Sequence, residues 1–511
     1  MNQLFAMKKY LRILLAIVIL SSCSSTKNLQ GKKDDGKLEL NLILINDVYE
    51  IAPLSGGSEG GMARVASLKK KYLQENKNTF LLVAGDFLSP SVYNSLLYEN
   101  RPIRGRQMVE AMSAAGVDLV TFGNHEFDIR ENELQERINE SGFQWISSNV
   151  YHKKGNSFYP FTKTNGQPFP RTMIMELQDE DGTKAKIGFI AVCLPFNRAD
   201  YVHYEDPITT AKTLFNQLKD SVDAVVALTH QTMEEDRHLA REIPELALIL
   251  GGHEHDGRFD KIGNVYITKA LANARSAYVV EMKINTRKNK IKVDPELEII
   301  NEKISLDSST NQVVQKWVAV ADKSFEALGF NADNIVLDKG EPLEGREALI
   351  RSRPTNLGKL ITESMQFANP QAEVVIFNSG SIRVDDILHM PVTEYDIIRT
   401  LPFGGGIREV EMKGSLLLQL LDQGEKNIGS GGYLIHNVAN TNEGWRFKGS
   451  AIDPNKNYRV AMSEFLLTGK EVHLEFLTEK NKDITKVYEA AKPGTLSSDI
   501  RLALIKFLQR K

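Results

Sequence analysis

Short apolar runs recur along the first half of the chain, and each ends in a polar or glycine-containing turn. The runs span residues 40–45, 80–84, 117–122, 187–192, 222–228, 246–250 and 265–268. Helical patterns, such as residues 63–73 and 105–115, lie between several of them. Buried strands that alternate with helices predict a layered α/β core. We expect this core to end near residue 300.

The chain is too long for one compact core, because single cores stop growing near ~250–300 residues and this chain has 511. Residues 311–328 place apolar side chains on one face of a helix. We expect this helix, within a linker at 305–330, to join a first domain at 37–304 to a second at 331–511. The second domain mixes strand patterns (374–377, 408–412, 458–462) with helical ones (357–367, 415–421), which predicts a separate α+β unit.

The N-terminus has the layout of a secretory signal. Lys8, Lys9 and Arg12 precede an apolar run at 13–20, and Cys23 follows two serines. The run is too short to span a bilayer; the alternative is a membrane-associated helix. The layout resembles the bacterial lipobox, which implies a signal peptide at 1–22, lipid on Cys23, a tether at 23–36 and a lipoprotein anchored in the cell envelope.

Only two cysteines are present, so lipid on Cys23 would leave Cys193 alone in an apolar stretch. We expect Cys193 to be a buried small hydrophobe, with no disulfide in the mature protein. The formal net charge of −3 argues against a nucleic-acid partner, which would favour a basic surface.

Five of the apolar runs lead into side chains that bind metals. The segments are Asn46-Asp47, Gly85-Asp86, Gly123-Asn124-His125, Thr229-His230 and Gly252-His253-Glu254-His255. Because the carboxyl ends of strands in α/β sheets converge on one crevice, we expect these side chains to meet. Mixed Asp, Asn and His ligands suit Mn, Zn, Fe or Co. Two such ions would need a bridging carboxylate and a position for water.

Each of these signals is weak alone, since a Gly-Asp pair is usually a turn and a lone histidine is usually a core or surface residue. Their joint occurrence is what indicates a metal site. His253 and His255 are two residues apart, so in extended backbone they would project to the same side. Asp128 lies three residues beyond His125 and would orient that imidazole, cap a helix, or do both.

The order of these motifs resembles the calcineurin-like metallophosphoesterases over the whole first domain, and the chain as a whole resembles the 5'-nucleotidase family. The resemblance implies a layered β-sandwich flanked by helices. It implies that Asp86 bridges two divalent ions, that His125 stabilises the transition state or protonates the leaving group, and that the remaining ligands divide between the ions. Asp47 and His255 would bind the first ion, and Asn124, His230 and His253 the second.

One position departs from the family pattern. The first motif of the family reads Asp-x-His, whereas this chain has Asp47-Val48-Tyr49. A neutral phenol, with a pKa near ~10, is a poor ligand compared with imidazole. We therefore predict that the first metal site is weaker or selects a different ion.

The second domain also resembles the nucleotide-binding domain of 5'-nucleotidases. Arg351 and Arg353 stand in a segment like the one before its first helix, Asn378 and Arg383 in its Asn-Gly-Gly-Gly-Ile-Arg loop, and Phe403 in its aromatic loop. Guanidinium groups suit phosphate oxygens, and Phe403 with Phe465 would stack on a base. Alternatively, the arginines form a solvated face and the phenylalanines ordinary core. Glu471 stands near the position of an aspartate that meets ribose in the family.

These features predict a metal-dependent hydrolase of extracytoplasmic nucleotides that releases nucleoside and phosphate. A UDP-sugar or a 2',3'-cyclic nucleotide is an alternative substrate for the same metal core. A rival hypothesis is a catalytically silent surface lipoprotein that binds a nucleotide or another partner. It is motivated by Tyr49 and by the loop Thr468-Gly469-Lys470-Glu471, which stands where the family has Gly-Gly-Asp-Gly.

Overall fold

The structure is a computed structural model that describes residues 33–197 and 199–511. The expected signal peptide, Cys23 and most of the expected tether lie outside the described residues, so these features remain predictions from sequence. Among the described residues, no helix is long and apolar enough to cross a membrane.

The first domain contains two six-stranded sheets packed against each other. The strand order of the first sheet is β17 (Lys290–Ile299), β16 (Ser276–Asn285), β1 (Lys37–Ile45), β2 (Thr79–Ala84), β5 (Leu119–Thr121) and β6 (Gln144–Trp145). The order of the second is β14 (Arg258–Ile262), β15 (Val265–Lys269), β13 (Leu248–Gly252), β12 (Ala224–His230), β10 (Lys184–Cys193) and β9 (Thr172–Gln178). The predicted layered α/β core is confirmed.

Strand β1 shows why the two sheets pack face to face. Its side chains alternate between two cores, as the period of a strand requires. Leu40 and Leu42 belong to the core between the sheets, together with residues of β10 and β12. Ile43 and Ile45 instead belong to the core between the first sheet and its helices. The first sheet is therefore covered on both faces.

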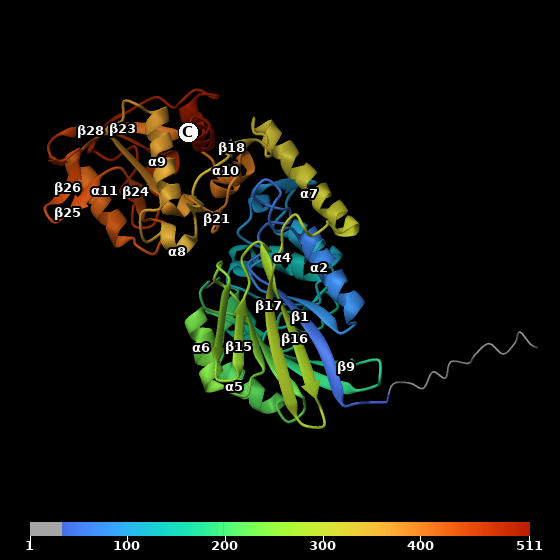
Figure 1. Cartoon of the computed structure of the whole chain (residues 1–511). Coiled ribbons are helices and arrows are strands. Elements are labelled where there is room, and N and C mark those ends of the chain that lie inside the picture. Colours follow the sequence, from blue (N-terminus) through green and yellow to red (C-terminus); the bar gives the residue numbers. More distant parts are fainter. Residues whose placement is uncertain (1–32, 198) are drawn as a thin grey trace, which may run out of the picture.

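Helices flank both sheets. Helices α2 (Met62–Glu75), α3 (Arg106–Ala114) and α4 (Glu131–Glu140) pack on the first sheet. Helices α5 (Pro207–Leu218) and α6 (Met233–Glu242) pack on the second. Figure 1 shows α2 to the right of the strands and α5 and α6 to the left. A smaller sheet of β11 (Val202–Tyr204), β7 (Val150–Lys154) and β8 (Ser157–Tyr159) projects from this domain.

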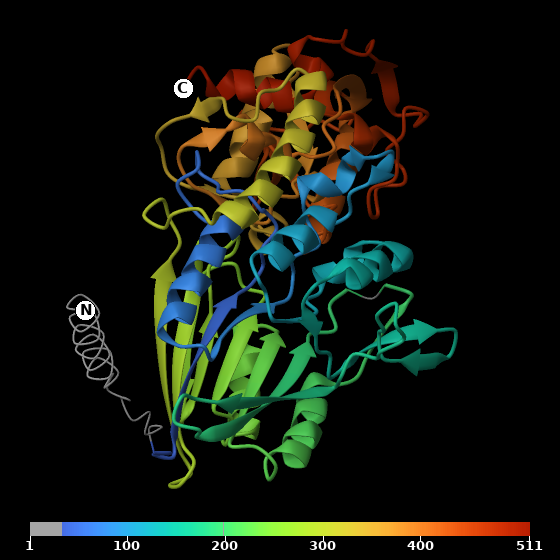
Figure 2. The same ribbon diagram turned by 90° about the vertical axis from the view of Figure 1, so that its right-hand side faces the viewer.

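Helix α7 (Ser308–Ala327) forms where the apolar face was expected, and it packs against α2 and α3. Asp307 begins the helix by accepting a hydrogen bond from the backbone N–H of Thr310. Figure 2 shows α7 crossing from the first domain toward the second.

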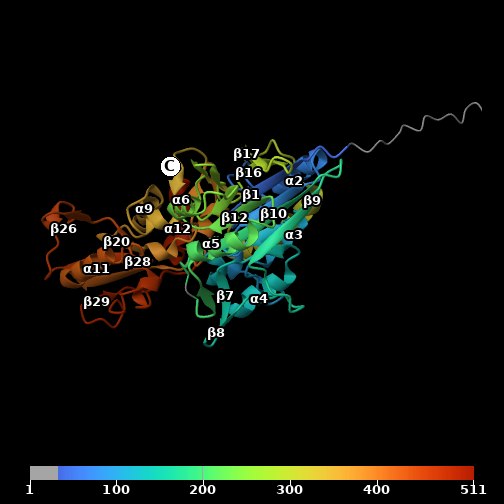
Figure 3. The same cartoon turned by 90° about the horizontal axis from the view of Figure 1, so that it is seen from below.

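The second domain is an α+β unit, as predicted. Its five-stranded sheet has the order β24 (Leu434–His436), β20 (Val374–Asn378), β28 (Asn457–Ser463), β23 (Ile407–Lys413) and β29 (Ile484–Val487). Its helices are α8 (Glu347–Ile350), α9 (Asn356–Ala368), α10 (Glu394–Thr400), α11 (Gly414–Lys426) and α12 (Ile500–Leu508). Helix α11 covers one face of the sheet, and α9 packs with α12. Seen from below in Figure 3, this domain projects to one side of the first.

Buried polar side chains join the two domains. Asp386 of the second domain pairs with Arg275 of the first at 2.8 Å and with Arg399 at 3.1 Å. Asp386 also accepts a hydrogen bond from the amide of Asn273 at 2.9 Å. A charge buried this deeply is costly without its partner. Separating the domains would break the pair between Asp386 and Arg275, so the network stabilises this contact between the domains. It places the loop before β21 (Ile387–Leu388) beside the strand ends of the first domain.

Candidate metal centre and substrate cavity

The predicted ligands gather at one edge of the sandwich, but they come from both sheets. Strands β1, β2 and β5 of the first sheet lead to Asp47, Asp86 and Asn124, whereas β12 and β13 of the second lead to the histidines. The strand ends thus converge on one crevice, and two packed sheets contribute to it. His230 connects the sheets by donating from Nδ1 to the carbonyl oxygen of Ala84 at 2.7 Å.

Asp86, His230 and His253 form a compact donor set. One ligand atom of each lies within 4.8 Å of the others. Within the described part of the chain, this is the cluster of three His, Cys, Asp or Glu side chains close enough to share one metal ion. His230 Nε2 lies 3.0 Å from Asp86 Oδ2 and 3.2 Å from Asn124 Oδ1. Asp86 Oδ2 is buried, and none of its contacts has the geometry of a hydrogen bond. A buried carboxylate oxygen without a hydrogen bond, facing imidazole nitrogens, fits a divalent cation.

Asp47, Tyr49 and His255 lie beside this set. Asp47 Oδ1 is 3.4 Å from His255 Nε2, and the hydroxyl of Tyr49 lies 3.1 Å from the same nitrogen. The phenol also lies 3.5 Å from Asp47 Oδ1, so it is close to both candidate ligands of the first ion. Burial, and then the nearby Asp86 and Asp47 carboxylates, raise the pKa of Tyr49 well above its usual value.

Three of these residues adopt positive φ angles. The values are 53° for Asp47, 55° for Asp86 and 86° for His253. Residues other than glycine rarely adopt a positive φ, and those that do cluster at functional sites. The expectation that His253 and His255 share an extended segment is wrong, because β13 ends at Gly252 and the backbone turns at His253. The turn directs the two imidazoles to different carboxylates.

Glycines allow the loops to approach closely. A Cβ at Gly123 would lie 2.2 Å from Asp86 Oδ1, and one at Gly252 would lie 2.4 Å from the carbonyl oxygen of Ala84. Any side chain at either position would displace the candidate ligands.

Glu126 is a residue that the sequence reasoning did not assign. It is fully buried, and its carboxylate accepts backbone hydrogen bonds from Asp86, Phe87 and Gly123 at 2.8, 2.8 and 2.6 Å. Burial, and then the nearby Asp86 carboxylate, raise its pKa to about 7. Glu126 therefore ties the loop after β2 to the loop after β5. Its position directly after Gly123-Asn124-His125 was the signal in the sequence that could have identified Glu126.

His125 and Asp128 are in contact, as the interpretation that Asp128 orients the imidazole requires. His125 Nδ1 lies 2.7 Å from Asp128 Oδ2, and Asp128 also accepts hydrogen bonds from Ser89 Oγ at 3.0 Å and Asn197 Nδ2 at 2.7 Å. The N-cap alternative is wrong, because Arg130 precedes α4. Burial lowers the pKa of His125, but Asp86 and Asp128 more than offset this, so the net pKa lies well above its usual value.

Two neighbouring cavities extend from these residues. A cavity of about 600 Å³ is lined by both domains, including Asp86, Asn124, His125, His253, His255, Arg351 and Asp385. A cavity of about 1100 Å³ in the second domain is lined by Arg351, Asn378, Arg383, Phe403, Phe465 and Glu471, among others. Arg351 lines both cavities. One side chain thus connects the candidate metal site to the larger cavity.

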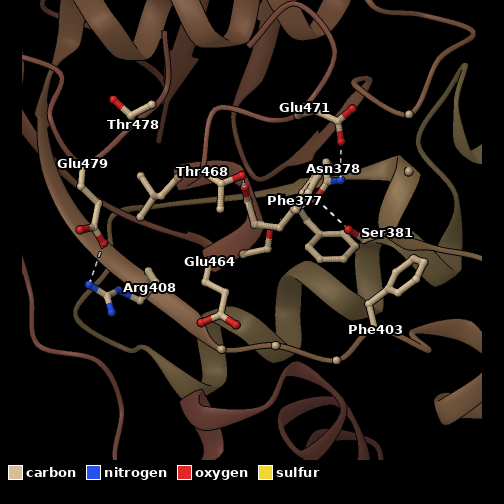
Figure 4. A pocket seen from close by; sticks show the side chains of 18 of the residues that line it. Phe377, Asn378, Ser381, Phe403, Arg408, Glu464, Thr468, Glu471, Thr478 and Glu479 are labelled. Atoms are coloured by element: carbon tan, nitrogen blue, oxygen red, sulfur yellow. Dashed lines mark hydrogen bonds and ion pairs between the residues drawn. The ribbon is translucent and has the colours of Figure 1, made fainter. Parts of the chain in front are cut away.

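The structure places most of the predicted substrate-binding residues in the larger cavity (Figure 4). Phe403 is 70% exposed and Phe465 is 40% exposed, so neither is ordinary core. Asn378 is buried and donates a hydrogen bond to Glu471 at 2.7 Å. Arg353 is an exposed residue that is not among those lining the two cavities.

Two sequence families match the chain in the order of its domains. The calcineurin-like phosphoesterase family matches residues 40–257, and the 5'-nucleotidase C-terminal domain matches residues 337–479. The chain combines a calcineurin-like phosphoesterase domain with a 5'-nucleotidase C-terminal domain. This domain pair is the one that the sequence motifs indicated, and it makes the protein a phosphoric ester hydrolase.

Known proteins are similar to this chain over most of its length. A 5'-nucleotidase of Vibrio parahaemolyticus is 27% identical to this chain in an alignment that covers 85% of this chain and 83% of that protein. A human 5'-nucleotidase is 24% identical over 77% of this chain and 73% of its own. The crystal structure of a 5'-nucleotidase precursor from Thermus thermophilus covers 93% of this chain and 96% of its own, with a TM-score of 0.63 and 21% identity.

The calcineurin-like phosphoesterase fold implies divalent metal ions. The donors at the edge of the sandwich fit that requirement, because Asp86, His230 and His253 converge and Asp86 Oδ2 lacks a hydrogen bond. Cys193 is buried, as expected.

Proposed function

We propose that this protein is a metal-dependent 5'-nucleotidase that acts outside the cytoplasm and releases nucleoside and phosphate. The observation that supports this most directly is Arg351, which lines both the metal cavity and the cavity that contains the exposed Phe403. A terminal phosphate next to the metals and a base next to Phe403 would belong to the same substrate. A phosphatase without base recognition would not need the second cavity.

Within this proposal, the ligands divide between two ions. Asp47, His255 and Asp86 would hold the first ion, and Asp86, Asn124, His230 and His253 would hold the second. Tyr49 would weaken the first site. Mn, Zn, Co or Fe suits these donors. When bound, two such ions activate water and neutralise charge on the phosphoryl oxygens.

The other residues act on the substrate. His125 donates a proton to the departing sugar oxygen, and Asp128 keeps the imidazole oriented and charged.

Arg351 and Arg383 bind phosphate oxygens through their guanidinium groups. Phe403 and Phe465 stack on the base, while Asn378 and Glu471 face the ribose. Arg353 stays a weaker candidate for substrate binding because it is exposed outside the cavities.

The proposal includes the cellular location and the domain limits. The lipobox-like sequence before Cys23 supports a lipid-anchored protein of the cell envelope, joined to the membrane by the tether at 23–36. The catalytic domain spans residues 37–304, the linker 305–330 and the substrate-binding domain 331–511.

A catalytically silent nucleotide-binding protein is the second candidate, and the phenol of Tyr49 beside Asp47 and His255 is the observation in its favour. Phosphate release from a panel of nucleotides, a UDP-sugar and a 2',3'-cyclic nucleotide, with added Mn²⁺, Co²⁺ or Zn²⁺, separates the candidates. We expect turnover by the wild type and its loss in His125→Ala and Asp86→Ala. Tight nucleotide binding by the metal-loaded wild type, with no turnover of any ester, would establish the silent protein instead.

A further inference from the structure

Lys269 is a fully buried lysine that the proposed mechanism does not use. It is the last residue of β15, and its side chain is 0% exposed. Its Nζ lies 2.8 Å from Asp236 and 2.5 Å from Glu254. It also donates hydrogen bonds to the backbone carbonyls of Gln231 at 2.5 Å and Gly252 at 2.9 Å.

The residues that Lys269 holds are the immediate neighbours of two candidate metal ligands. Gln231 follows His230, Gly252 precedes His253 and Glu254 follows His253. Glu254 in addition accepts a hydrogen bond from the backbone N–H of Met233, the first residue of α6. One ammonium group therefore connects the loop after β12 to the loop after β13.

The surroundings of Lys269 are built for a charged ammonium. A Cβ at Gly251 would lie 2.9 Å from Lys269 Cε and 3.0 Å from Asp236 Oδ2, so only glycine leaves room for this ion pair. Burial lowers the pKa of Lys269, but Asp236 and Glu254 offset this and raise it. A buried charge is costly unless it is paired and hydrogen-bonded. The four contacts of Lys269 meet that requirement.

The loop at His253 has a particular need for such an anchor. His230 is fixed through its ring, because Nδ1 donates to Ala84. The backbone of His253 has a strained φ of 86°, and its N–H donates to Asp47 Oδ2 at 2.9 Å. The centres of the two imidazole rings are 5.4 Å apart. Their spacing depends on how firmly the loop at His253 is held to the loop at His230.

We propose that Lys269 is a positioning residue for the second metal site: its ammonium group holds the loops that carry His230 and His253 at the spacing that one ion requires. The inference rests on the proposed function only in taking these histidines as ligands. Groups behind metal ligands typically change metal affinity by roughly 10–100-fold. Lys269 would act through the backbone of both loops, and not by touching the ion.

Lys69 provides a matched control in the same domain. It is also largely buried, and its Nζ contacts Asp118 at 2.7 Å and the backbone carbonyl of Gly116 at 2.5 Å. Asp118 precedes β5, whereas Asn124 follows that strand. Lys69 therefore makes the same kinds of contact at the end of the sheet away from the candidate ligands.

The test compares Lys269→Met with Lys69→Met in the full mature protein. Tightly bound Mn²⁺ or Co²⁺ is measured by elemental analysis and calorimetric titration, and the visible spectrum of the Co²⁺ form reports ligand geometry. We expect both variants to lose thermal stability. Only Lys269→Met should bind the second ion roughly 10–100-fold more weakly, with an altered Co²⁺ spectrum, and excess metal should restore its turnover. Equal metal affinity in the two variants would overturn the proposal.

A second variant keeps the test decisive if Lys269→Met does not fold. Glu254→Gln retains an acceptor for the N–H of Met233 but removes the carboxylate that contacts Lys269. Weaker binding of the second ion in this variant supports the proposal, and unchanged binding contradicts it. Metal affinity is measured without substrate, so a lack of nucleotide turnover by the wild type would refute the proposed function separately.

Discussion

His255 donates a hydrogen bond from Nδ1 to the backbone carbonyl of Asp385, so a candidate metal ligand of the first domain is oriented by the second domain. A carbonyl oxygen only accepts, which assigns the proton to Nδ1 and directs Nε2 toward Asp47, 3.4 Å away. Fixing the second ring nitrogen in this way is how proteins orient histidine ligands. The first metal site therefore depends on the contact between the domains.

Tyr49→His should strengthen the first metal site. The phenol lies 3.1 Å from His255 Nε2, so an imidazole at this position would add a direct ligand beside Asp47. Partners behind the ligands already change metal affinity by roughly 10–100-fold, and a direct ligand should change it at least as much. Calorimetric titration of the metal-free protein with Mn²⁺ measures the effect. Tyr49→Phe, which removes the hydroxyl without adding a ligand, should show no such gain, and equal gains in both variants would contradict the explanation.

His125→Ala should slow nucleotide hydrolysis by a factor that depends on the leaving group. General acid catalysis contributes roughly 10²–10⁴-fold, and a poor leaving group such as a ribose oxygen needs the proton most. We expect a large loss of kcat with a nucleoside monophosphate and a small loss with 4-nitrophenyl phosphate, whose product is stable as an anion. Asp128→Asn should follow the same pattern to a lesser degree, because it acts through His125 at 2.7 Å. Equal losses with both substrates would exclude proton donation.

The sequence predicts those parts of the site that follow strands. Asp86 and Asn124 come directly after apolar runs, so the convergence of strand ends is enough to bring them together. Glu126 and Lys269 were not predicted, because their partners lie up to 40 residues away along the chain, in loops that follow other strands. Nothing local distinguishes a buried lysine at a strand end from an exposed one.

The turn of the backbone at His253 could not be predicted from the sequence either. The pattern His253-x-His255 is compatible with a strand or a turn, and the structure has a turn, with a positive φ at His253 next to the close approach of Gly252 to Ala84. The contact between His255 and Asp385 needs the arrangement of both domains. The motif match groups Arg353 with Arg351, whereas the structure leaves Arg353 exposed outside both cavities, so its role in substrate binding stays a prediction.

Phe403→Ala should weaken nucleotide binding with little effect on folding. Stacking of a base on an aromatic ring is worth roughly 1–3 kcal/mol, so KM for a nucleoside monophosphate should rise about 5- to 150-fold. The ring is 70% exposed, and surface substitutions usually change stability by less than about 0.5 kcal/mol. Steady-state kinetics and thermal unfolding measure both quantities.

Phe196→Ala is the matched control for Phe403→Ala. Phe196 is 61% exposed but lines the metal cavity and not the larger one. KM should change little in this variant if base stacking belongs to Phe403. An unchanged KM in Phe403→Ala would show that the base does not stack on Phe403.

Asp386→Asn should loosen the contact between the domains in a pH-dependent manner. Burial raises the pKa of Asp386, but Arg275 and Arg399 more than offset this and lower it to about 2. The folded-state pKa lies below the usual value of 3.8, so the carboxylate stabilises the folded state above that pH. The contribution is lost as pH falls toward 2. Breaking a buried ion pair costs roughly 3–5 kcal/mol, and we expect a loss of that size at pH 7.

Urea unfolding at pH 7 and near pH 2.5 checks this expectation. The difference in free energy of unfolding between wild type and Asp386→Asn should shrink at the lower pH, because the wild type then loses part of the same interaction. Asp220→Asn removes an exposed carboxylate of the first domain and should change little at either pH. A difference for Asp386→Asn that stays constant with pH would mean that packing around the side chain, and not its charge, holds the domains together.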